Sequence, residues 1–249
     1  MATLRAVIFD LGHTLWDYAP REDSRRLNIL RLYQRLAASL GDGAPSPAAL
    51  DRALGETAQR WFDSWNTDRL EQPPSEQLVS EALEALGCVV PDDLVRSLTA
   101  VMFGAGADMP VLEPDTLATI GGFQQRGLAM GCVTNTILTE EGIVDPLRRL
   151  GLLRYLRSTV VSSTMGYRKP HPSLFLRALE ELDVAPGEAV FVGDRLVDDV
   201  GGAQAVGMRA VLTHQYRREE LGSAPATPNA VIGRLSELPA ALERIEEQA

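Results

Sequence analysis

The chain has 249 residues, of which 45% are hydrophobic, and this suits one large domain or a core with an inserted unit. Its formal net charge of −10 argues against nucleic acid as a partner, because a phosphate backbone attracts basic surfaces. Apolar runs all fall short of the roughly 20 residues that span a bilayer, and the N-terminus lacks the basic-then-apolar layout of a signal peptide. We therefore expect a cytoplasmic protein that does not enter a membrane.

Short apolar runs that end at polar or glycine-rich stretches predict the strands of a buried sheet. These runs cover residues 4–9, 128–133, 158–161, 189–192 and 209–213. From the second run onward, helical patterns alternate with them, and another helix closes the chain. The predicted helices cover residues 140–150, 173–182, 198–206 and 237–248. Continuous apolar strands that alternate with helices indicate an α/β fold with a parallel sheet covered on both faces.

The segment from 17 to 108 breaks this alternation, and its pattern predicts helices separated by prolines. It predicts a helical domain over 17–108, inserted into a core made of 1–16 and 109–249. We expect Asp17 to begin the first helix of this insert. The aromatic side chains of Trp61, Phe62 and Trp65 are interpreted as its core rather than as ligand-facing groups.

Polar side chains follow the predicted strands at the points where the strands end. In chain order they are Asp10, Thr134, Asn135, Lys169, Asp194, Asp198 and Asp199. Because ligands bind outside the carboxyl ends of parallel strands, we expect these side chains to lie together. Lys169 is conspicuous as the single lysine among 24 basic side chains. An ammonium is a compact point charge that an arginine does not replace, which favours a role in a site.

This set of side chains suits phosphoryl transfer. Neighbouring carboxylates repel each other unless a cation lies between them, and Mg²⁺ is the natural choice for oxygen ligands beside a phosphate. A hydroxyl, an amide and an ammonium can hold the oxygens of a phosphoryl group. An aspartate beside the metal can attack in line and form an acyl phosphate.

Four stretches, in this order, resemble the motifs of the haloacid dehalogenase superfamily. They are FDLGHTL at 9–15, Thr134-Asn135, RKP at 168–170, and Gly193-Asp194 followed by Asp198-Asp199. The resemblance covers about residues 4–15 and 110–240. It implies a Rossmann-like parallel sheet core with an α-helical cap inserted after the first motif, and the cap is expected to choose the substrate.

The resemblance also implies a role for each residue. Asp10 would be the nucleophile and would bind Mg²⁺ together with the Gly12 carbonyl and Asp194. Thr134 and Lys169 would act in catalysis. These two residues and Asn135 would bind the phosphate. Asp198 or Asp199 would orient a water on the metal or the lysine, and the motif leaves open which of the two does so.

The pattern departs from the family at Gly12, where its phosphatases carry a second aspartate that protonates the leaving group. Three outcomes stay open. The substrate has a good leaving group, another residue such as His13 or Asp17 supplies the proton, or turnover is weak. His13 is favoured as a capping or surface residue, and His171 as a residue that turns its loop.

We therefore expect a Mg²⁺-dependent phosphatase that acts on a small phosphorylated metabolite. A 2-haloacid dehalogenase is a weaker alternative. Dehalogenases of the family also lack the second aspartate, but their first motif has an aromatic residue and then a glycine where this chain has Gly12 and His13. They also lack the Gly193-Asp194 pair. A catalytically weak phosphate-binding or regulatory protein is the third possibility. The sequence does not indicate an oligomeric state.

Overall fold

A six-stranded parallel sheet forms the centre of the computed structural model, which describes residues 3–18, 22–65, 69–106 and 110–247. The strand order is β5-β4-β1-β6-β7-β8. The strands are β1 (Ala6–Phe9), β4 (Ala129–Thr134), β5 (Ser158–Val161), β6 (Ala189–Gly193), β7 (Arg209–Thr213) and β8 (Ala230–Ile232). The predicted α/β fold with a parallel sheet is confirmed.

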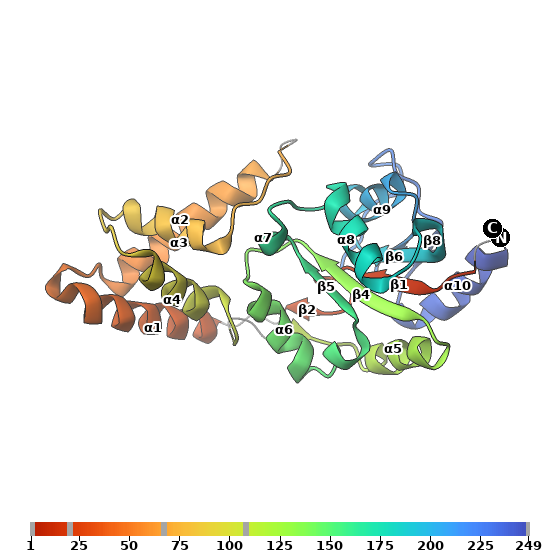
Figure 1. Ribbon diagram of the computed structural model, residues 1–249, viewed down its shortest axis with the longest axis horizontal. Helices are drawn as coiled ribbons and strands as arrows, with labels where there is room; N and C mark the ends of the chain where they lie inside the picture. Colours follow the sequence, from red (N-terminus) through yellow and green to blue (C-terminus); the bar gives the residue numbers. More distant parts are fainter. Residues whose placement is uncertain (1–2, 19–21, 66–68, 107–109, 248–249) are drawn as a thin grey trace.

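Helices cover both faces of the sheet (Figure 1). On one face, α5 (Thr116–Gln125), α6 (Glu140–Arg149) and α10 (Leu238–Glu247) pack on inward side chains such as Val7 and Phe9. On the other face, α8 (Pro172–Leu182) and α9 (Gly202–Ala205) pack on Ala6 and Ile8. Successive side chains of β1 thus point to opposite faces, and all four are buried, which explains the unbroken apolar run.

Four further helices lie beyond the end of the sheet, at the left of Figure 1. They are α1 (Glu22–Leu40), α2 (Pro47–Ser64), α3 (Ser75–Glu84) and α4 (Asp92–Phe103). Their inward residues, from Ile29 to Phe103, make a hydrophobic cluster of their own. Because residues 107–109 fall outside the described residues, the division into 1–16 with 109–249 and 17–108 stays a prediction.

The two chain segments that join these helices to the sheet run side by side. Asp17 and Tyr18 form β2 (Asp17–Tyr18), which pairs antiparallel with β3 (Pro110–Val111). The prediction that Asp17 begins a helix is therefore wrong: the described part of α1 starts at Glu22. Asp17 instead lies in extended backbone, and its side chain contacts His13.

Helix α5 and strand β8 are among the elements that the sequence analysis did not predict, and one predicted helix differs from the structure. Helix α5 contains Gly121 and Gly122, which weaken a helical pattern, and β8 has three residues of which one is buried. The segment predicted as a helix over 198–206 begins as a π-helix at Leu196–Gly201 and continues as α9. Single π turns inside helices often mark functional sites.

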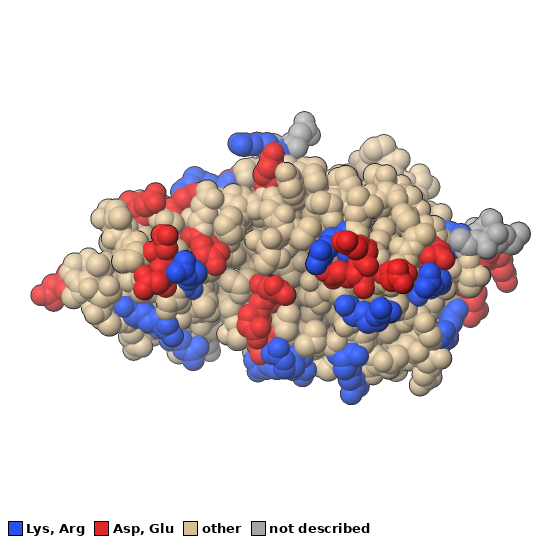
Figure 2. All heavy atoms as spheres, viewed as in Figure 1, with Lys and Arg blue, Asp and Glu red and all other residues tan. Residues whose placement is uncertain are grey.

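The surface carries charges of both signs. On the face shown in Figure 2, basic and acidic side chains alternate in small groups. Within the described residues, no helix is both long enough and apolar enough to cross a membrane.

Candidate active site

A cavity of about 960 Å³ opens at the carboxyl ends of β1, β4 and β6, between the sheet and α2. It gathers residues that are far apart in the chain. Among those lining it are Asp10, Gly12, Thr134, Asn135, Lys169, Asp194, Asp198 and Asp199. The structure therefore brings together every residue that the sequence analysis placed in the site.

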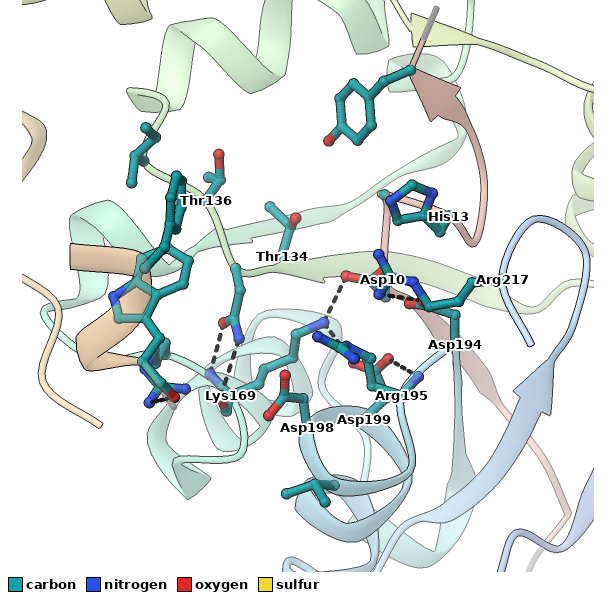
Figure 3. A pocket seen from close by; sticks show the side chains of 18 of the residues that line it. Asp10, His13, Thr134, Thr136, Lys169, Asp194, Arg195, Asp198, Asp199 and Arg217 are labelled. Carbon is teal, nitrogen blue, oxygen red and sulfur yellow. Dashed lines mark hydrogen bonds and ion pairs between the residues drawn. The ribbon is translucent and has the colours of Figure 1, made fainter. Parts of the chain in front are cut away.

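Lys169 lies at the centre of this group, between two carboxylates (Figure 3). Its Nζ donates to Asp10 Oδ1 at 2.6 Å and to Asp199 Oδ1 at 2.7 Å. All three residues are buried, and only 2% of the lysine side chain is exposed. A buried charge requires such partners, so the ammonium is fixed beside the predicted nucleophile.

Asn135 holds the backbone of this lysine from both sides. The Lys169 N–H donates to Asn135 Oδ1 at 2.7 Å, and Asn135 Nδ2 donates to the Lys169 carbonyl at 3.1 Å. The amide side chain thus positions the lysine loop. Thr134 ends β4 with a buried side chain at the cavity wall. Phosphate binding by either residue stays a prediction.

The choice between Asp198 and Asp199 has a geometric answer. Asp199 is buried, contacts the lysine, and accepts the Arg195 backbone N–H through Oδ2 at 2.9 Å. Asp198 is half-buried at the cavity wall and makes no such contact with Lys169. The π-helix that begins at Leu196 contains both residues, and it is Asp199, not Asp198, whose side chain contacts Lys169.

Asp10, Asp194 and Asp199 form a cluster that can hold a metal ion, since each offers an oxygen within 4.8 Å of the others. Arg217 reaches Asp194 from the loop after β7, with Nη1 2.9 Å from Oδ2. Three carboxylates thus face two cations within this cluster, and one negative charge stays uncompensated. A hard divalent cation with oxygen preference fits this donor set.

The pKa values show the same shortage of positive charge. Burial raises the pKa of Asp10 to about 6, although Lys169 acts to lower it. Burial, and after it the charges of Asp10 and Asp199, raise the pKa of Asp194 to about 8. Burial alone would lower the pKa of Lys169, but the two carboxylates outweigh it and the pKa lies above its ordinary value. One ammonium cannot neutralise three buried carboxylates.

The loop after Asp10 contributes Gly12 and His13 to the cavity wall. His13 has a positive φ of 58°, and its Nδ1 lies 2.9 Å from Asp17 Oδ1. Burial, and then the charge of Arg217, lower the pKa of His13. His13 therefore lines the site rather than the outer surface, whereas His171 caps α8 by accepting the Ser173 N–H, as its loop role suggested.

The helical insert closes one side of the cavity. Trp61 packs in the insert core as expected, but Phe62 and Trp65 line the cavity, so for these two the core interpretation is wrong. Their rings meet edge to face at 4.9 Å. Arg168, the neighbour of Lys169, donates to the Trp65 and Arg69 carbonyls at 2.6 and 2.8 Å. The residue beside the lysine therefore also ties the insert to the core.

Sequence reasoning missed Arg217, Arg195 and Tyr18, which also line the cavity. A signal for Arg217 was present, because it follows the strand predicted over 209–213. The rule that strand ends converge applies to that strand as it does to the others. Arg195 carried the same signal, since it follows the strand predicted over 189–192. Tyr18 carried none, since it belongs to a two-residue strand.

Comparisons with known proteins agree with this geometry. A family model described as haloacid dehalogenase-like hydrolase matches residues 4–207. The chain is 27% identical to the glyceraldehyde 3-phosphate phosphatase of Methanopyrus kandleri, over 88% of this chain and 87% of that protein. It is 32% identical to the ribulose-1,5-bisphosphate 5-phosphatase of Halopiger xanaduensis, over 85% of this chain and 84% of that protein.

A solved structure of a 2-haloacid dehalogenase from Pseudomonas syringae pv. Tomato DC3000 has a TM-score of 0.67 and 28% identity to this chain, covering 98% of it and 100% of the other. The family match spans most of the sheet and all four motif stretches. The chain therefore belongs to the haloacid dehalogenase-like hydrolases.

Proposed function

We propose that this hydrolase is a Mg²⁺-dependent phosphatase that cleaves the phosphomonoester of a small metabolite through an aspartyl phosphate on Asp10. The observation that carries the proposal is the cluster of three buried carboxylates, which faces one ammonium and one guanidinium and therefore lacks one positive charge. Phosphatases among its relatives support the same reaction class.

Each residue of the site has its own role in the proposed reaction. Lys169 holds Asp10 in place and offers its ammonium to a phosphoryl oxygen, while Asp199 keeps the ammonium oriented. Thr134 supplies a hydroxyl at the cavity wall. An Asp10 oxygen attacks phosphorus in line, the ester bond breaks, and water then hydrolyses the acyl phosphate.

Asp10, Asp194 and the Gly12 carbonyl would hold the metal ion. When bound, Mg²⁺ would neutralise the carboxylates and stabilise negative charge on the phosphoryl oxygens. Burial of Asp10 and Asp194 favours this, because buried carboxylates without a cation are costly.

Helices α1–α4 would act as a cap over 17–108 that selects the substrate. Phe62 and Trp65 line the same cavity as the nucleophile, so the part of the substrate that leaves would contact aromatic side chains. The cavity volume of about 960 Å³ accepts a metabolite-sized molecule.

The test is a screen of phosphometabolites with and without Mg²⁺, beside Asp10→Asn. We expect phosphate release that needs the metal and is lost in the variant, with protein-bound ³²P trapped by acid quench. Equal rates in excess chelator would contradict the proposal.

A dehalogenase is the second candidate, because a 2-haloacid dehalogenase shares the fold and Gly12 carries no carboxylate. Asp194 beside Asp10 argues against it, since a second buried carboxylate there opposes a metal-free reaction. Halide release from a 2-haloacid in chelator would favour this candidate.

A further inference from the structure

Tyr18 fills the space beside the backbone of Gly12. A Cβ added to Gly12 would lie 3.1 Å from Tyr18 Oη and 3.2 Å from its Cε2. The phenol hydroxyl thus occupies the volume that a side chain at position 12 would enter, two residues after Asp10. Tyr18 also lines the same cavity as Asp10 and Lys169.

Three contacts hold this tyrosine in place. Its backbone pairs with Pro110 of β3, and its N–H donates to Asp17 Oδ1 at 2.8 Å. Its ring meets the His13 ring edge to face, with centroids 5.8 Å apart. Tyr18 is 39% exposed and lines the cavity, so these contacts fix the tyrosine at the cavity wall.

Hydrolysis of an alkyl phosphate requires a proton for the leaving oxygen, and the candidates near Asp10, Tyr18 included, have interaction partners of their own. Lys169 is shared by Asp10 and Asp199. Asp194 faces Arg217, and His13 turns Nδ1 toward Asp17. Tyr18 combines a proton-bearing hydroxyl with a position next to the nucleophile loop.

We propose that Tyr18 is the general acid and base of this enzyme, an inference that rests on the proposed phosphatase function. As Asp10 attacks phosphorus, the ester P–O bond breaks and the leaving oxygen takes the proton from Tyr18 Oη. The phenolate then takes a proton from the water that attacks the aspartyl phosphate. The products are the alcohol, phosphate and a free Asp10, so atoms and charges balance.

The experiment compares Tyr18→Phe with the wild type on two substrates, an alkyl phosphate that the wild type cleaves and 4-nitrophenyl phosphate. Rapid quench measures phosphoenzyme formation in a single turnover. We expect the variant to slow the alkyl phosphate by about 10²–10⁴-fold, since general acid help is lost. Nitrophenolate leaves without a proton, so its step should change less than about threefold.

Two further variants make the result specific. Tyr167→Phe removes the hydroxyl of a similarly exposed tyrosine (38%) outside the cavity lining and should leave both rates unchanged. Gly12→Asp in a Tyr18→Ala background returns an acid to the vacated space and should recover part of the alkyl phosphate rate. In wild-type protein, the same substitution meets the Tyr18 ring and should not help.

Equal slowing of both substrates by Tyr18→Phe would overturn the proposal and show a structural role, as would no slowing of either. Failure of the double variant while Tyr18→Ala still binds Mg²⁺ and orthovanadate like the wild type would also count against it. Absence of phosphoenzyme in the wild type with 4-nitrophenyl phosphate would instead remove the phosphatase function on which the proposal rests.

Discussion

The Arg217 guanidinium lies 2.9 Å from Asp194 Oδ2, where it neutralises a carboxylate proposed to bind the metal (Figure 3). A divalent ion would have to compete with this contact. The arginine side chain is 35% exposed, so solvent screens this ion pair and its interaction free energy is small.

We therefore predict that Arg217→Ala raises Mg²⁺ affinity by about two- to fivefold, as expected for the loss of a partly exposed ion pair. Isothermal titration of the metal-free protein measures the change. Arg218→Ala is the matched control, because this neighbouring arginine is exposed and outside the cavity lining. Weaker binding in Arg217→Ala would show that the arginine supports the metal site instead of competing for it.

Mg²⁺ affinity should also depend on pH. The pKa of Asp194 is raised to about 8 and that of Asp10 to about 6, and a metal binds the deprotonated forms. Protons therefore compete with the ion at low pH. We expect affinity to rise about tenfold per pH unit as pH approaches 8 and then to level off, with a steeper dependence below pH 6. A pH-independent titration from pH 5.5 to 9 would contradict this.

Many residues of the site could be predicted from the points in the sequence where the strands end. Asp10, Thr134 and Asp194 sit at the ends of apolar runs, so the parallel sheet alone places them at one edge. Lys169 follows the end of β5 by eight residues, and it was recognised as a site residue because it is the single lysine of the chain. These features are local in the sequence, which is why the sheet core and the convergence of these side chains were predictable.

The remaining features depend on backbone geometry that the sequence does not encode locally. Asp198 and Asp199 differ by one position, and a π-helix decides which of them faces the lysine. Phe62 and Trp65 lie on a helix whose apolar side chains divide between the insert core and the cavity. Tyr18 reaches the site because two chain segments pair as β2 and β3, a non-local contact.

The single lysine permits a direct measurement of the central ion pair. Selective ¹³Cε-lysine labelling gives one side-chain signal, because Lys169 is the chain's one lysine. Its two carboxylate partners outweigh burial and raise its pKa above the ordinary 10.5. We expect the ¹³Cε shift to stay that of an ammonium as pH rises through 10.5, where a solvent-exposed lysine has lost half its protons.

The matched variant for this measurement is Asp199→Asn, which removes one of the two carboxylate charges but keeps an oxygen near Nζ. The lysine should then lose its proton at a lower pH than in the wild type. A wild-type signal that titrates below 10.5 would mean that burial, rather than the carboxylates, governs the ammonium.

Gly193 offers a way to displace Asp199 without touching its charge. A Cβ at position 193 would lie 2.3 Å from Asp199 Cγ, so Gly193→Ala forces this carboxylate away from Lys169. We predict a loss of about 1–3 kcal/mol in the free energy of unfolding from overpacking, together with a lower kcat. Gly187→Ala is the control, because a Cβ there meets nothing within 4 Å. Chemical denaturation and steady-state kinetics measure both effects, and unchanged kcat in a destabilised Gly193→Ala would mean that Lys169 keeps its function with Asp10 alone.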